Sequence, residues 1–258
     1  MRNVKLVLAY DGTDFSGWQT QPGRRTVQET LEQAIRQLTG EDVRTMASGR
    51  TDAGVHALGQ VVNFHTQSTL PAETVARALN ATLPDDIVVH GASEVADSFN
   101  ANFDVKRKLY RYVMHNGPVA DVFLRRFAHR LRVRLDAAAM HRAAQRLAGR
   151  HDFQSFETDW PNRSSSVRTI THISVNRGSA WPAQVSPCSG DLGDLLWLDV
   201  EADGFLYNMV RAIAGTLINV GRGFWPEERV RAILEARDRR QAGPTAPAKG
   251  LFLVRVEY

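Results

Sequence analysis

Two kinds of hydrophobic pattern alternate along the chain. The first is a short apolar run closed by turn residues, as in Val4–Tyr10, which is followed by Asp11-Gly12. Runs of this length and spacing predict β-strands. On this basis the sequence predicts strands at Val4–Tyr10, Val61–Phe64, Ile87–His90, Tyr110–Met114, Ile170–Val175, Leu195–Val200 and Leu251–Tyr258.

The second pattern places apolar residues three or four positions apart, which predicts helices. Thr26–Leu38 is the clearest case, because Thr26 and Glu29 form a capping box and Gly40 can end the helix. The same period predicts helices at Ala72–Leu79, from the capping residue Asp136 to Leu147, at Phe205–Val220, and from Pro226 to about Arg237.

The predicted elements alternate through both halves of the chain, as in an α/β or α+β protein, and we predict the α+β class. A soft boundary near Phe103–Lys106 divides the chain into predicted domains at residues 1–104 and 105–258. Gly178–Gly193 is rich in Pro, Ser and Gly and predicts a surface excursion between two strands.

The distribution of charge along the chain is more informative than the net charge. The net charge is only +4, but basic residues gather in one stretch, where Asp121 is the single acid. They are Lys106, Arg107, Lys108, Arg111, Arg125, Arg126, Arg130, Arg132 and Arg134. Such a stretch indicates a polyanion partner, or else a solvated basic face.

Several classes of site and location are disfavoured. Cys188 is the only cysteine, so one chain can build neither a disulfide framework nor a thiolate zinc site. No His and carboxylate spacing predicts a metal site. Because no run of about eighteen uncharged apolar residues and no signal peptide is visible, we expect a cytoplasmic protein without a membrane span.

Ser48–His56 carries the candidate chemistry. Gly49 and Gly54 flank Arg50, Thr51 and Asp52, which predicts a tight loop where a carboxylate and a guanidinium meet one ligand. Taken alone, the segment equally fits an Asx-type turn.

The rest of the chain adds a resemblance. The run Gly49–His56 resembles the active-site motif of the tRNA pseudouridine synthase A family. Further matching segments follow in chain order over nearly the whole sequence: Tyr10–Gln19, Thr26–Gln28, Lys108–Tyr112, His151–Phe153, Gly204–Arg211, Gly243–Ala248 and Gly250–Val254.

The resemblance implies roles for four residues. Asp52 would be the catalytic nucleophile or base, and Arg211 would pair with it. Tyr110 would lie against the target base, and Arg50 would help displace the uridine from its stack. The implied fold has two α/β halves whose mainly antiparallel sheets join around a central cleft. The implied protein is a homodimer that binds the tRNA anticodon stem-loop.

The implied reaction explains these residue types. Turning uridine into pseudouridine breaks the N1–C1′ bond and joins C5 to C1′, which requires no cofactor. A carboxylate acts as nucleophile or base only when ionised, and a nearby guanidinium favours that form. Sequence leaves open whether Asp52 attacks C1′ or removes a proton.

Candidate RNA contacts are basic or aromatic residues; the set is Arg24, Phe99, Phe103, Lys106, Arg107, Lys108 and Arg168. Near two of them the sequence departs from the family pattern. Asn100 stands where the family usually has His, and Asn102 where it usually has Arg, which argues against charged contacts there.

Two other functions remain alternatives. A non-catalytic RNA-binding or RNA-folding protein could use the same scaffold, although Asp52 and Tyr110 are both retained. A glycoside hydrolase would need two carboxylates flanking the bond, and no second acid accompanies Asp52 in its loop.

Overall fold

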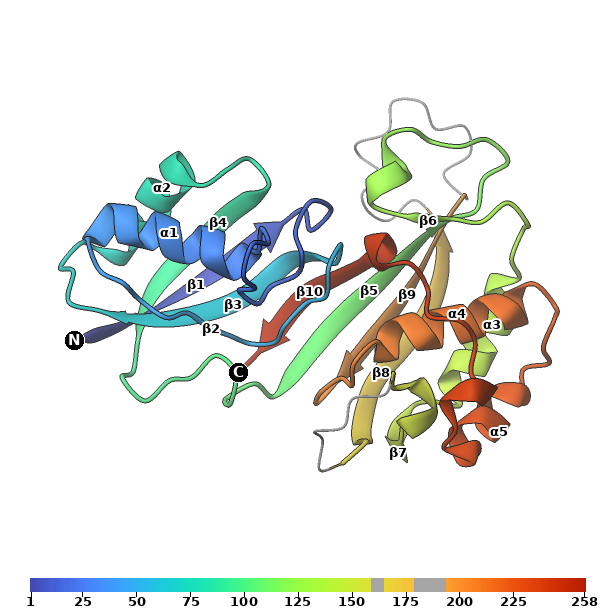
Figure 1. Ribbon diagram of the computed structural model, residues 1–258. Helices are drawn as coiled ribbons and strands as arrows, with labels where there is room; N and C mark the ends of the chain where they lie inside the picture. Colours follow the sequence, from blue (N-terminus) through green and yellow to red (C-terminus); the bar gives the residue numbers. More distant parts are fainter. Residues whose placement is uncertain (159–164, 179–193) are drawn as a thin grey trace. The chain divides into compact units, whose positions relative to one another are not determined.

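The computed structural model describes residues 1–158, 165–178 and 194–258. They form two compact units, drawn in Figure 1. The first unit holds Met1–Lys108 and Phe252–Tyr258, and the second holds Leu109–Leu251. The chain thus passes to the second unit four residues after the predicted boundary, and the final strand, which we expected in the second half, lies in the first unit.

The first unit is a mainly antiparallel sheet with two helices. Its strand order is β4 (Ile87–Val95), β1 (Arg2–Tyr10), β3 (His56–Thr66) and β10 (Leu251–Glu257), and β2 (Met46–Ala47) also pairs with β3. The pairing of β10 with β3 is parallel. Helices α1 (Val27–Thr39) and α2 (Ala72–Thr82) cover one face (Figure 1), where Leu6, Leu8, Leu31, Ile35, Phe64 and Leu79 are fully buried.

The ends of α1 follow the predicted signals. The side chain of Thr26 accepts a hydrogen bond from the Glu29 amide, and Gly40 adopts a left-handed conformation with φ 76°. Gly takes this conformation without the steric cost of a Cβ atom. The predicted cap and stop are therefore confirmed.

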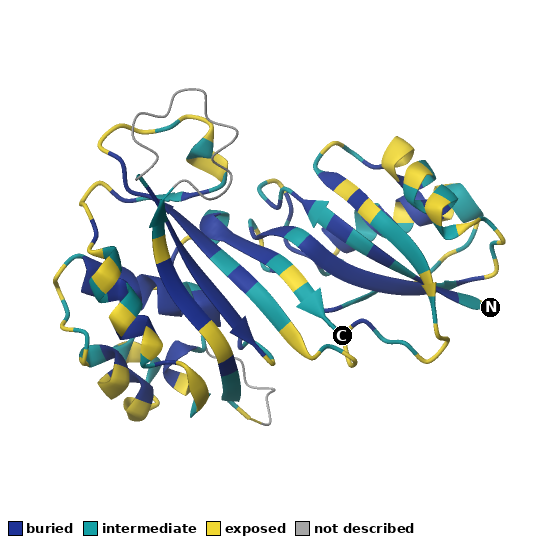
Figure 2. Cartoon of the chain, turned by 180° about the vertical axis from the view of Figure 1, so that it is seen from behind, coloured by how far each residue is buried: buried dark blue, intermediate teal, exposed yellow. Residues whose placement is uncertain are grey.

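The described residues of the second unit form strands β5 to β9 and three α-helices. The strand order is β5 (Arg107–His115), β9 (Leu195–Ala202), β8 (Val167–Gly178) and β7 (Gly149–Asp152), and β6 (His129–Arg130) pairs with β5. Its helices are α3 (Ala137–Gln145), α4 (Met209–Gly221) and α5 (Arg229–Ala236), and 3-10 turns lie at Leu124–Arg126, Gln154–Phe156, Arg239–Gln241 and Ala248–Gly250. Figure 2 shows buried positions concentrated on strands and exposed ones on outer helical faces. The α+β prediction is confirmed.

Two predicted helix starts are wrong. Helix α4 is largely buried, as expected, but begins at Met209 instead of Phe205 because Asn208 has φ 62° and cannot continue a right-handed helix. Helix α5 begins at Arg229, and Pro226 lies in the preceding turn, where its carbonyl accepts from the Arg229 amide at 3.1 Å.

Three further predictions concern a membrane span, a metal site and the Gly178–Gly193 excursion. In residues 1–158, 165–178 and 194–258, no helix is long and apolar enough to cross a membrane. The same residues contain no cluster of three or more His, Cys, Asp or Glu side chains that could hold a metal ion. Most of the Gly178–Gly193 excursion, including Cys188, lies outside the described residues.

Candidate active-site residues

The loop that carries Asp52 joins β2 to β3 and packs against the segment after β1. The Trp18 amide donates to the Thr51 carbonyl at 2.9 Å. Close backbone packing requires glycine at two positions: a Cβ atom on Gly12 would lie 1.9 Å from the Val55 carbonyl oxygen, and one on Gly17 would lie 2.8 Å from that of Thr51. The Tyr10–Gln19 motif therefore packs against the Asp52 loop and supports its backbone.

A buried hydrogen-bond network also fixes this loop. The hydroxyl oxygens of Tyr10 and Thr51 lie 2.8 Å apart, and the Gln60 amide donates to the Gly49 carbonyl at 2.8 Å. The Ser48 hydroxyl donates to Gln60 Oε1 at 2.5 Å. Burial raises the pKa of Tyr10 to about 12, so its hydroxyl stays neutral at physiological pH.

The residues of the Asp52 loop differ in exposure. Thr51 is buried, whereas Asp52 is half-buried and Arg50 is exposed. The Lys108 ammonium also approaches this loop, since a Cβ atom on Gly49 would lie 2.7 Å from Lys108 Nζ. The structure thus brings Arg50, Asp52 and Lys108 to one part of the first unit.

His56 ends the motif in a structural role. Its Nδ1 accepts a hydrogen bond from the Gly12 amide at 3.0 Å, and its ring stacks on Phe252 with centroids 4.7 Å apart. Asp11 Oδ1 lies 3.2 Å from the same nitrogen. The Gly12 amide and the Asp11 carboxylate therefore both contact this ring nitrogen, and together with Phe252 they fix the orientation of the imidazole.

In the second unit, Tyr110 lies on β5 and is buried. The rings of Tyr110 and Phe205 pack edge to face, with centroids 4.9 Å apart and an interplanar angle of 78°. Phe205 belongs to the same sequence motif as Arg211. This contact is an aromatic packing arrangement that fixes the Tyr110 ring.

Arg211 lies in the first turn of α4, and hydrogen bonds to Ala246 and Asn208 orient its guanidinium. Its Nε donates to the Ala246 carbonyl at 2.7 Å, and its Nη1 donates to Asn208 Oδ1 at 2.7 Å. The Ala246 amide in turn donates to the Arg211 carbonyl at 3.1 Å. The segment around Ala246 therefore holds both ends of the Arg211 residue.

Glycines bring that segment against α4. A Cβ atom on Gly215 would lie 1.8 Å from the Pro244 carbonyl oxygen, and one on Gly243 would lie 2.6 Å from the Thr216 amide nitrogen. The Gly243 amide donates to Thr216 Oγ1 at 2.9 Å. This close packing against α4 explains why the motif Gly243–Ala248 begins with glycine.

The predicted RNA contacts differ in exposure. Arg24, Lys106 and Arg107 are exposed, and Phe103 is 80% exposed. The remaining three are half-buried: Lys108, Phe99, which packs on Tyr258 at 4.9 Å, and Arg168, which donates to the Ser165 and Val167 carbonyls.

Arg111, one of the basic stretch, serves the fold. Its guanidinium binds the Asp199 carboxylate through two hydrogen bonds of 2.7 and 2.8 Å. Strand alternation offered a signal for this difference, because it puts Arg111 on the opposite face of β5 from Tyr110 and Tyr112. Asn208 and the Tyr10–Gln60 network were not predicted, since no local pattern reports their partners.

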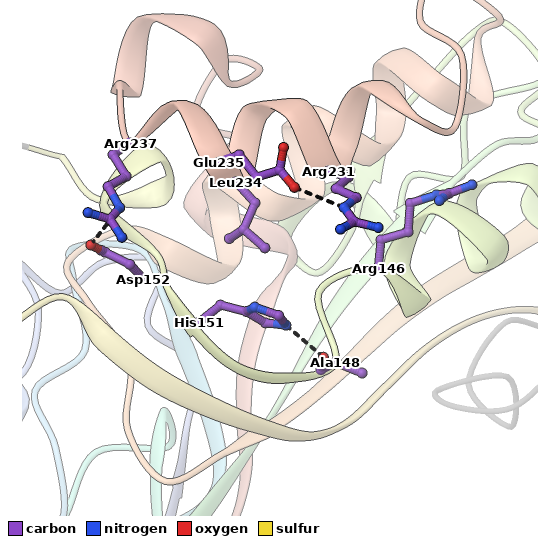
Figure 3. A pocket seen from close by; sticks show the side chains of 8 residues that line it. All are labelled: Arg146, Ala148, His151, Asp152, Arg231, Leu234, Glu235 and Arg237. Carbon is purple, nitrogen blue, oxygen red and sulfur yellow. Dashed lines mark hydrogen bonds and ion pairs between the residues drawn. The ribbon is translucent and has the colours of Figure 1, made fainter.

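A hollow of about 630 Å³ in the second unit is a different feature (Figure 3). Its lining residues are Arg146, Ala148, His151, Asp152, Arg231, Leu234, Glu235 and Arg237, which include none of the predicted site residues. Arg237 pairs with Asp152 at 3.2 Å, and Arg231 pairs with Glu235 at 2.9 Å. These internal ion pairs offset much of its positive charge.

Comparisons with known proteins bear on this arrangement. The model of a family described as tRNA pseudouridine synthase matches residues 6–104 and 143–258. Asp52 and Arg211 lie within these ranges, and Tyr110 lies outside them. The alignment with a solved chain from the crystal structure of the archaeal box H/ACA sRNP Nop10-Cbf5 complex spans 83% of this chain and 43% of that chain. Its 15% identity and TM-score of 0.29 add nothing to an assignment.

Curated relatives match along their full length. The chain is 48% identical to tRNA pseudouridine synthase A of Brevibacillus brevis and 44% identical to that of Acetivibrio thermocellus, each over 258 residues and 100% of both chains. It is 46% identical to that of Moorella thermoacetica over 257 residues and 99% of both chains. With a family model that covers most of the sequence and relatives at this level, the chain belongs to the tRNA pseudouridine synthase family.

Proposed function

We propose that this protein isomerises uridine to pseudouridine at positions 38 to 40 of the tRNA anticodon stem-loop. The observation that carries the proposal is the Asp52 loop. Its motif matches the family, and its backbone is fixed by packing against the Tyr10–Gln19 segment. A rigid loop holds its reactive group in one place, which lowers the cost of reaching the transition state.

The reaction is an isomerisation, so its atoms balance without a co-reactant. The N1–C1′ bond breaks, C5 bonds to C1′, the proton on C5 leaves, and N1 takes up a proton. Asp52 either attacks C1′ or removes a proton, and both routes need its carboxylate in the ionised form.

The other site residues have supporting roles in this proposal. Arg211 favours the charged form of the Asp52 carboxylate, and Tyr110 packs against the target base. A uridine within a stem must leave its stack, which costs a few kcal/mol. Arg50 is exposed, as it must be to fill the vacated space.

The direct test is tritium release from tRNA labelled at uridine C5, followed by mapping of the modified positions. We expect release that requires uridine at positions 38 to 40. A protein that binds tRNA in a salt-sensitive manner and releases no tritium would be the non-catalytic RNA-binding alternative.

Lys106 and Arg107 supply a prediction about phosphate contacts. Replacing both with Gln is expected to weaken tRNA binding and to lower the slope of log K against log salt by about 1 to 2, because each phosphate contact releases counterions. The rate constant at saturating tRNA should change little. Binding titrations at several salt concentrations measure both effects.

The matched control replaces two exposed arginines of the second unit, Arg231 and Arg240, with Gln. Each pairs with a neighbouring carboxylate, Glu235 or Asp238, as Arg107 pairs with Glu257 at 3.9 Å. If the control lowers the salt slope as much as the Lys106 and Arg107 pair does, the effect reflects net charge, and Lys106 and Arg107 are not specific contacts.

We further propose a homodimer that acts in the cytoplasm, where its tRNA substrate is made and used. Tritium release identifies the activity and says nothing of the assembly. Light scattering across the concentrations used for the assay measures it, and a monomeric mass throughout would contradict the dimer.

A further inference from the structure

Asn208, immediately before α4, has an unusual backbone conformation. Its φ is 62°, and among the described residues only Arg237 shares a positive φ without being glycine. This left-handed conformation favours glycine, and asparagine tolerates it better than most other residues. The conformation alone therefore does not explain why a side chain is present.

Capping does not explain the side chain either. Asparagine before a helix usually accepts hydrogen bonds from the first amides of that helix, but Asn208 makes no such bond to α4. Its Oδ1 instead accepts from Arg211 Nη1 at 2.7 Å, and its Nδ2 donates to Thr158 Oγ1 at 3.1 Å. The Asn208 amide thus bridges Thr158 to Arg211.

The bridge determines how Arg211 can move. The Ala246 carbonyl holds Nε of the guanidinium, and Asn208 holds Nη1. With both nitrogens bound, the planar group cannot rotate about its long side chain without breaking one bond. The contact with Asn208 is made by a side chain, so substitution can remove it and leave the backbone in place.

We propose that Asn208 is a positioning residue that fixes the orientation of the Arg211 guanidinium for catalysis. This inference rests on the proposed function, in which Arg211 acts on the Asp52 carboxylate. It assigns Asn208 no contact with RNA or with the reacting atoms.

Asn208→Gly tests the proposal, because glycine keeps the backbone conformation and removes the bridge. We expect the single-turnover rate constant for tritium release to fall about 10- to 100-fold, since small misplacements of catalytic groups have effects of this size. The KM for tRNA should stay within about twofold of wild type. The unfolding midpoint should move by only a few degrees.

Arg237→Gly is the matched control. It makes the same change at the other left-handed residue, which ends α5 and pairs with Asp152 (Figure 3). We expect wild-type rate constants from this variant. An equal loss in both variants would show that the backbone change is responsible and would overturn the proposal.

A double-mutant cycle with Arg211→Gln separates this inference from the proposed function. In the Arg211→Gln background, Asn208→Gly should change the rate constant by less than about twofold, because the residue it positions is gone. An impaired Arg211→Gln with a fully active Asn208→Gly overturns the positioning role alone. A fully active Arg211→Gln overturns the role proposed for Arg211 and this inference with it.

Asn208→Asp keeps the inference testable if the glycine variant fails to fold. Aspartate also tolerates the left-handed conformation and retains an oxygen that accepts from Arg211. Its rate constant should exceed that of Asn208→Gly at least about fivefold, or lie within about fivefold of wild type if glycine does not fold. A rate constant more than about tenfold below wild type, whether or not the glycine variant folds, would overturn the proposal, because the accepting oxygen would then not be the feature that matters.

Discussion

Asp52→Asn is expected to lower the rate constant for tritium release by a factor on the order of 10⁴, and the variant should still fold and bind tRNA. An amide has the shape of the carboxylate but carries no charge, so it can neither attack C1′ nor accept a proton as the carboxylate does. Losses of this size are typical when a catalytic carboxylate is removed. Single-turnover release with tRNA labelled at C5 measures the loss.

Folding and charge are controlled separately. The contacts that hold the Asp52 loop include the Trp18 amide and the hydroxyls of Tyr10 and Thr51, which the substitution does not alter. Asp42→Asn removes one exposed carboxylate from the same unit, where Asp42 pairs with Arg36, and should leave the rate constant unchanged. An Asp52→Asn variant within tenfold of wild type would remove Asp52 from the chemistry.

Gly215→Ala is expected to destabilise the protein by about 3 kcal/mol, at the upper end of the cost of overpacking. In an ordinary helix interior this change stabilises by about 1 kcal/mol, so the expected sign is reversed. The new methyl group would lie 1.8 Å from the Pro244 carbonyl oxygen. That carbonyl cannot retreat easily, because Gly243 and Ala246 on either side are bonded to α4.

Urea unfolding measures the change in the free energy of unfolding. Gly91→Ala is the control, since a Cβ atom there would meet nothing within 4 Å and the change should stay within about 0.5 kcal/mol. A Gly215→Ala variant as stable as wild type would mean that the Pro244 segment can move away from α4. Tritium release should also fall in any folded fraction, because the same segment holds Arg211.

Periodicity predicted the central parts of the strands and helices because those residues are buried within each unit. It failed where backbone geometry overrides the pattern. Leu206 and Met209 continue the apolar period, yet Asn208 breaks the helix between them. Strand β7, Gly149–Asp152, has no apolar run and exists through its pairing with β8, which no local pattern could predict.

The candidate site shows a similar division. Motif resemblance singled out Asp52 and Arg211 but could not say what holds them. The supports of the Asp52 loop come from Tyr10 and Gln60, and that of Arg211 comes from Ala246. Hydrogen bonds between positions so far apart in sequence cannot be predicted from residue spacing. Arg111 shows the opposite case: its charge suggested a contact with RNA, but its guanidinium binds Asp199.

The return of the chain to the first unit sets an order of assembly during translation. The whole second unit, Leu109–Leu251, is synthesised before residues 252–258, yet β10 supplies the parallel partner of β3 and the Phe252 ring that stacks on His56. A ribosome that has made residues 1–108 has therefore not made all of the unit that carries Asp52. Asp52 is encoded early, but the unit that carries it is complete only once residues 252–258 have been synthesised.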